Sequence, residues 1–126
     1  MSEVLNLLLR SDLPDTRKVL PMKQFRVTRL SELTGEDVVF TLRGLSYDKV
    51  REIQQKDRDP ALYMVLEGCE SPNFRDPALL DAGRGIVTPL DAIRARLSAG
   101  EIDEISVEVQ KLSGYLRKTL SELKNG

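Results

Sequence analysis

The sequence contains no histidine, no tryptophan and a single cysteine among its 126 residues. Histidine is the commonest general base near neutral pH and the commonest metal ligand. Its absence excludes a Ser-His-Asp triad, a Cys-His pair and the usual zinc sites. The lone Cys69 cannot form a disulfide within the chain, and its acidic neighbours Glu67 and Glu70 would raise the pKa of the thiol. We therefore expect Cys69 to be an inert packing residue.

An excess of one charge is also lacking, because 19 basic residues are balanced by 20 acidic ones and the net charge is −1. A nucleic-acid-binding protein needs a positive field to displace counterions from phosphate, and anionic lipid likewise attracts basic surfaces. The balance disfavours both partners. We interpret a local basic cluster as the solvated face of a strand, because acidic residues follow it at once. Its members are Arg17, Lys18, Lys23, Arg26 and Arg29.

The sequence has no long apolar run and no motif for a phosphate or a metal. The stretch from Val4 to Leu9 is too short to span a bilayer and lacks the flanks of a signal peptide, so a cytosolic location is expected. The calcium-loop and phosphate-loop spacings are absent. Acidic pairs such as Asp103 with Glu104 are explained by the start of a helix. We therefore predict no catalytic residue, no cofactor and no metal site, and the chain is not expected to be an enzyme.

Two segments have the alternating pattern of β-strands. Residues 22–30 form the first and residues 38–43 the second, in which Val38, Phe40 and Leu42 fall on one face. The residues between them are rich in Ser, Thr, Gly and Asp and predict a turn. The two segments and the turn together predict an antiparallel hairpin with one buried face. Because a lone hairpin is marginally stable in water, helices must cover that face.

Several further segments combine the apolar spacing of helices with a start signal such as Ser, Thr or Asp-Pro. They are residues 2–10, 46–56, 60–66, 88–100 and a last helix from 101. A buried strand is the alternative for residues 60–66. Residues 68–75 are predicted to be irregular, a short turn or helix is expected at 77–80, and a tight turn at 83–85. The predicted fold class is α+β: an antiparallel β-hairpin covered by several short helices, with a predominantly helical C-terminal half.

Apolar stripes mark the two ends of the chain. The N-terminal stripe is Val4, Leu5, Leu8 and Leu9, and the C-terminal stripe is Leu116, Leu120 and Leu123. Each stripe could pack into the core or bind a partner, and core packing is the favoured alternative for the N-terminal stripe. The C-terminal stripe could continue the last helix, unless Gly114 breaks it. These residues are the candidate partner-binding residues, on ends (1–10 and 116–126) that are expected to be mobile.

The order of short sequence pieces is more informative than any one of them. The pieces are KQFRVTRL at 23–30, VFTLRGLS at 39–46, EGCESPNF at 67–74, GIVTP at 85–89, LSAGEI at 97–102 and LSGY at 112–115. In this order the chain resembles the XkdN-like tail assembly chaperones of long-tailed phages and defective prophages. The resemblance extends roughly from Lys23 to Tyr115. It implies one chaperone-like domain over residues 1–126.

The resemblance also implies a function and partners. Such a protein would act in the cytoplasm of the bacterial host, bind the tape measure protein, help recruit tail tube subunits and be absent from the mature virion. Self-association is a further expectation. The alternatives are a structural tail completion or connector protein of the virion and a small regulatory nucleic-acid-binding protein, followed by a histidine-free acid/base enzyme.

Overall fold

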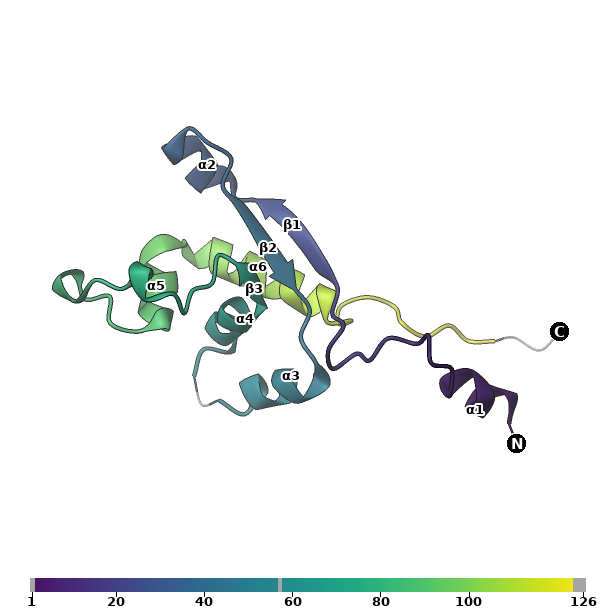
Figure 1. Ribbon diagram of the computed structural model, residues 1–126. Coiled ribbons are helices and arrows are strands. Elements are labelled where there is room, and N and C mark those ends of the chain that lie inside the picture. Colours follow the sequence, from purple (N-terminus) through teal and green to yellow (C-terminus); the bar gives the residue numbers. More distant parts are fainter. Residues whose placement is uncertain (1, 57, 124–126) are drawn as a thin grey trace.

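A three-stranded sheet organises the part of the chain that the computed structural model describes, residues 2–56 and 58–123 (Figure 1). Strands β1 (Met22–Arg26) and β2 (Val39–Arg43) pair antiparallel, with Phe25 opposite Phe40. Phe40 and Leu42 are buried, as the alternation predicted. The third strand, β3 (Cys69–Ser71), pairs antiparallel with β2, so the order is β1-β2-β3. The prediction of loop at β3 was wrong, because three residues are too few to show an alternation.

The predicted first strand is too long, and the predicted turn after it is a helix. Strand β1 ends at Arg26, and Thr28–Thr34 form helix α2. Buried Ser31 holds this helix against the start of β2, since its Oγ accepts a hydrogen bond of 2.9 Å from the backbone N–H of Val38. Gly35 ends the helix in the left-handed conformation with φ of 77°. The contact between Ser31 and Val38, and not strand propensity, determines the structure of residues 28–34.

Helices α3, α4 and α5 begin close to the predicted positions, and α6 begins two residues before the predicted one. They are α3 (Tyr47–Gln54), α4 (Pro60–Gly68), α5 (Pro89–Arg96) and α6 (Ala99–Leu112), with 3-10 helices at Pro77–Leu79 and Ala82–Arg84. Ser46 caps α3 as predicted, and α4 is a helix and not the alternative strand. The α+β class is confirmed.

One helix boundary differs from the prediction. Helix α5 ends at Arg96, and Gly100 lies inside α6 instead of stopping the helix before it. Ser98 begins α6 through a capping box: its Oγ accepts from the N–H of Glu101 at 3.2 Å, and the Glu101 carboxylate accepts from the N–H of Ser98 at 2.7 Å. This reciprocal pair satisfies two backbone donors and outweighs the glycine signal.

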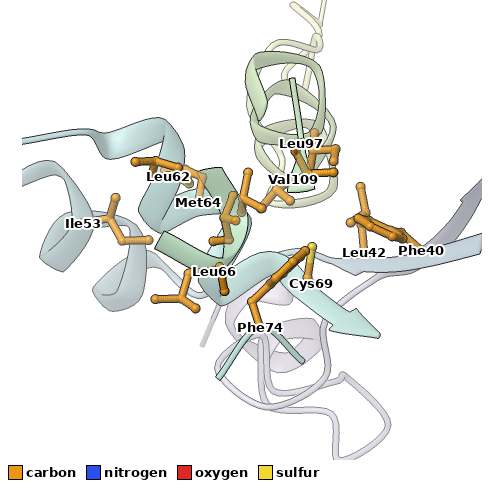
Figure 2. Packing of buried hydrophobic residues seen from close by; sticks show 14 of the residues in the cluster. Phe40, Leu42, Ile53, Leu62, Met64, Leu66, Cys69, Phe74, Leu97 and Val109 are labelled. Atoms are coloured by element: carbon orange, nitrogen blue, oxygen red, sulfur yellow. The ribbon is translucent and has the colours of Figure 1, made fainter. Parts of the chain in front are cut away.

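Helix α4 lies at the centre of the core, between α3, α5 and α6, with the sheet beside it (Figure 1). Val65 of α4, Ile93 of α5 and Val109 of α6 are fully buried. Figure 2 shows this cluster, in which Phe74 reaches the sheet and contacts Phe40 edge to face with ring centroids 6.0 Å apart. Helices α4 and α6 approach closely enough that only a glycine fits at position 68.

Helix α5 also begins with a capping box, formed by Thr88 and Asp91, and the two boxes at Thr88 and Ser98 give a stability prediction. We expect Thr88→Ala and Ser98→Ala each to lower the free energy of unfolding by about 1 kcal/mol, because each removes the acceptor for a backbone N–H at a helix start. Urea unfolding followed by circular dichroism measures the change. Exchanging Thr88 for Ser keeps the acceptor and is expected to restore most of the loss; equal losses for Ala and Ser would contradict the capping role.

Candidate partner-binding surfaces

Helix α1 (Glu3–Leu8) carries the N-terminal stripe outside the core. Ser2 caps it, with Oγ accepting from the backbone N–H of Val4 at 3.1 Å and of Leu5 at 3.4 Å. No residue of α1 is buried, and the four stripe residues are between 44% and 68% exposed. The favoured prediction of core packing was therefore wrong. The core is filled by residues of the sheet and of α3 to α6, and α1 lies outside it, beyond the segment that leads to β1 (Figure 1).

The C-terminal stripe is also exposed, and it is not helical. Helix α6 ends at Leu112, and the chain takes a positive φ of 97° at Gly114, so the predicted break occurs. Leu116, Leu120 and Leu123 are 63%, 84% and 88% exposed. Residues 124–126 of the predicted mobile end lie outside the described part of the chain.

The roots of both terminal segments meet at one junction on the body. The backbone N–H of Gly44 donates to the carbonyl of Pro21 at 2.9 Å, and the N–H of Leu45 donates to Ser113 Oγ at 2.8 Å. Beside these bonds lies a hollow of about 380 Å³, whose lining includes Tyr47 and Tyr115. The structure thus places the two segments on the same side of the molecule (Figure 1). It does not place the two stripes against one shared surface of the body.

A groove of about 360 Å³ lies between the sheet, α2 and residues 101–108 of α6. We call it the sheet–α6 groove. Its floor is apolar: Phe25, Val27, Phe40, Leu42 and Ile105. Its rim is polar: Arg26, Thr28, Arg29, Glu32, Glu101, Glu104 and Glu108.

An ion pair between α2 and α6 closes one end of the sheet–α6 groove. Arg29 donates from Nε and from its terminal nitrogen to the carboxylate of Glu101, at 3.1 and 2.9 Å, and the same terminal nitrogen also donates to the carbonyl of Arg96 at 2.8 Å. The hydrogen bond from Arg29 lowers the pKa of Glu101, with the Ser98 cap contributing in the same direction against desolvation. Glu101 therefore joins the helix start to α2.

This ion pair predicts a pH dependence of stability. Because the folded-state pKa of Glu101 lies below its ordinary value of 4.5, its contribution is complete above the unfolded pKa and is lost as the pH falls through the folded one. We expect the wild type to be more stable than Glu101→Gln at pH 6 and to lose this advantage as the pH falls below 4.5 and through the folded-state pKa. Urea unfolding at a series of pH values measures the difference. Glu104→Gln, at an exposed position on the same helix, is the control and should follow the wild type.

The rest of the predicted basic cluster is mostly neutralised. Arg17 pairs with Asp15 at 2.8 Å and Arg26 with Asp37 at 2.9 Å, as Arg29 does with Glu101. The arginines therefore offer no free positive surface, in line with the interpretation of this cluster as a solvated face. One part of that interpretation was wrong, because Arg29 belongs to a helix and not to the strand.

The described residues offer little for catalysis. Cys69 is buried, and desolvation raises the pKa of its thiol to about 12, so the prediction of a packing residue is confirmed. No group of three or more acidic or cysteine side chains within residues 2–56 and 58–123 could hold a metal ion. None of the helices in the same ranges is long and apolar enough to cross a membrane.

Reasoning from the sequence did not identify the sheet–α6 groove, because it placed α2 in a strand and a turn. A helical signal was present: Leu30, Glu32 and Leu33 are good helix formers, and Gly35 follows at the position of a helix end. The groove itself needs α2 and α6 together, and these lie far apart in the sequence.

Comparison with known proteins agrees with this arrangement. The crystal structure of the protein yqbn superposes with a TM-score of 0.57 at 18% sequence identity, covering 77% of this chain and 89% of that chain, and so has the same fold. No curated protein matches the chain. The family model of the phage XkdN-like tail assembly chaperone protein matches residues 57–125, which are 69 of the 126 residues. Since this match covers more than half of its length, the chain belongs to the XkdN-like family of phage tail assembly chaperones.

Proposed function

We propose that this tail assembly chaperone binds the tape measure protein and helps recruit tail tube subunits in the host cytoplasm, then leaves before the virion is complete. The observation that carries the proposal is the position of the N-terminal stripe: Val4, Leu5, Leu8 and Leu9 are exposed on a capped helix outside the core. A soluble protein rarely leaves adjacent leucines in water unless they meet another surface.

The geometry of α1 suits a weak and reversible contact. The helix has six residues and none of them is buried, so it is marginally stable alone and gains stability when its apolar face is covered. Each leucine that buries about half of its side chain contributes roughly 1 kcal/mol. Many copies along one long client would multiply these weak contacts into strong binding, and each copy could still dissociate.

The C-terminal stripe is the second partner-binding surface of the proposal. Leu116, Leu120 and Leu123 are exposed like the leucines of α1, and they leave the body at the same junction. The body of the protein, from β1 to α6, serves as the scaffold that holds both segments in one place. Neither role requires a catalytic group, which fits the inert Cys69.

Replacing Leu5 and Leu8 with Ser tests the N-terminal contact. We expect the free energy of unfolding to change by less than about 0.5 kcal/mol, because both residues are exposed. The affinity for the tape measure protein should fall roughly 30-fold, corresponding to about 2 kcal/mol. The measurement is co-expression with the tape measure protein of the same phage, followed by titration of the soluble complex.

A matched control is available on the same helix. Leu7 is 56% exposed. Because successive residues are rotated by about 100° around a helix, Leu7 points away from the stripe. Leu7→Ser should therefore leave binding unchanged. Equal losses for Leu7→Ser and for the Leu5/Leu8 variant would show a general loss of apolar surface instead of a specific contact. Finding the protein in purified virions would contradict the proposed chaperone role and indicate a structural one.

A further inference from the structure

We propose that the C-terminal stripe of one copy folds into a helix in the sheet–α6 groove of a second copy, so that copies join head to tail. The proposal goes beyond client binding. It names a second copy of this chain as the partner of Leu116, Leu120 and Leu123, and it leaves the N-terminal stripe for the client. It rests on the proposed function only in treating the C-terminal stripe as a partner-binding surface.

The C-terminal segment has the pattern of a helix that needs a partner. Leu116, Leu120 and Leu123 are spaced i, i+4 and i+7, so a helix over 116–123 would place them on one face. In the structure the segment is not helical and the three leucines are exposed. An isolated helix of this length is unstable in water, because nucleation is unfavourable and few hydrogen bonds follow. Covering the leucine face would supply the missing stabilisation.

The sheet–α6 groove matches this segment in length and in apolar character. The wall of the groove on α6 runs from Glu101 to Glu108, which are eight residues, as are 116–123. Each would span about 12 Å as a helix. The aromatic and aliphatic floor, which includes Phe25, Phe40 and Ile105, is the kind of surface onto which an amphipathic helix packs.

The charges of the two surfaces are complementary. The rim of the groove carries four glutamates against two arginines. Arg26 pairs with Asp37 and Arg29 with Glu101, and Lys111 pairs with Glu108, so Glu32 and Glu104 are the rim glutamates without an ion pair within the described residues. Glu104 is exposed. On a helix over 116–123, Arg117 would lie beside the leucine face, whereas Lys118 and Glu122 would lie on the opposite face. Arg117 is therefore placed to meet the acidic rim.

The position of the segment favours a second copy over the groove of the same molecule. The C-terminal segment leaves from the junction at the end of α6, while α2, which contributes to the groove, lies at the far end of the sheet from that junction (Figure 1). Each copy would thus hold one stripe and one groove at separate places. An interface between unlike surfaces leaves a free stripe and a free groove at the two ends, so assembly continues beyond a dimer.

Sedimentation velocity of the full chain over a range of concentrations tests the proposal, with no tape measure protein present. The wild type should form species larger than dimers as concentration rises. Leu120→Ser should weaken association at least roughly tenfold. Arg117→Glu should weaken it severalfold, and Lys118→Glu, the matched control on the opposite face, should change it less than about twofold.

Complementation separates the two surfaces. Leu120→Ser lacks a working stripe, and Glu104→Lys combined with Glu108→Lys lacks a working groove. Each variant alone should be monomeric, with the circular dichroism of the wild type. Their mixture should form a one-to-one heterodimer and nothing larger. In one chain, Arg117→Glu together with the two glutamate changes should restore assembly.

Four results would overturn the proposal: a wild type that stays monomeric at every concentration, association that Leu120→Ser leaves unchanged, a wild type that stops at a dimer, or a mixture of variants that stays monomeric. Because no client is present, these outcomes leave the test of tape measure binding by Leu5 and Leu8 untouched.

Discussion

Gly68→Ala is expected to lower the free energy of unfolding by about 3 kcal/mol, through overpacking between α4 and α6. A Cβ at this position would lie 2.7 Å from Val109 Cγ1 and closer still to Cγ2, with Val109 Cβ at 3.1 Å. Rotation of the Val109 side chain cannot relieve both methyl contacts, since a β-branched residue has one strongly preferred rotamer in a helix. The two helices must therefore separate, and Val109 is fully buried among their contacts.

A double-mutant cycle shows whether this contact is responsible. Val109→Ala alone also destabilises, because it leaves a cavity. Combined with Gly68→Ala, it removes the methyl groups that the new Cβ would meet. The loss in the double variant should be smaller than the sum of the two single losses by about 1 kcal/mol or more. Strict additivity would contradict the proposed clash.

The control for the Gly68 prediction is Gly100→Ala. Gly100 lies inside α6, and nothing stands within 4 Å of a Cβ built there. Alanine is expected to stabilise the protein by about 0.5 to 1 kcal/mol, because glycine in a helix loses more backbone entropy on folding. The same substitution at positions 68 and 100 should therefore have opposite signs.

Gly44→Ala is expected to destabilise the protein by more than 3 kcal/mol, the largest single effect, because its Cβ would meet backbone instead of a side chain. It would lie 2.8 Å from the carbonyl carbon of Leu112 and closer still to the carbonyl oxygen. The end of α6 can move only by breaking the bond between Leu45 N–H and Ser113 Oγ. Gly44 also donates to Pro21, so both terminal segments would be displaced.

Urea unfolding and native-state hydrogen exchange measure this effect. Exchange should accelerate at Leu45 and along the last turn of α6 before it does so at the centre of α4. Ser113→Ala, which removes the hydrogen-bond acceptor of Leu45 and a donor to the carbonyl of Val109, should cost about 1 to 2 kcal/mol. A Gly44→Ala protein as stable as Ser113→Ala would show that the backbones separate easily and that the junction is not rigid.

Local signals in the sequence were sufficient at several places where the deciding contact lies within a few residues. Ser46 and Thr88 begin helices through hydrogen bonds to N–H groups three residues ahead, and the alternation of Phe40 and Leu42 gives β2 its buried face. The order of such pieces also pointed to the family, which the match over residues 57–125 confirms. The lack of histidine left no usual catalytic site to predict.

The tertiary structure decided what depends on residues far apart in the chain. Ser31 makes a helix of α2 through Val38, and Gly44 and Gly68 matter only because Leu112 and Val109 lie against them. The seven leucine and valine residues of the two stripes have core-like spacing, yet they are exposed. The spacing of apolar residues determines which of them share a helix face. Whether that face is buried depends on whether the folded core still offers apolar surface for it to pack against.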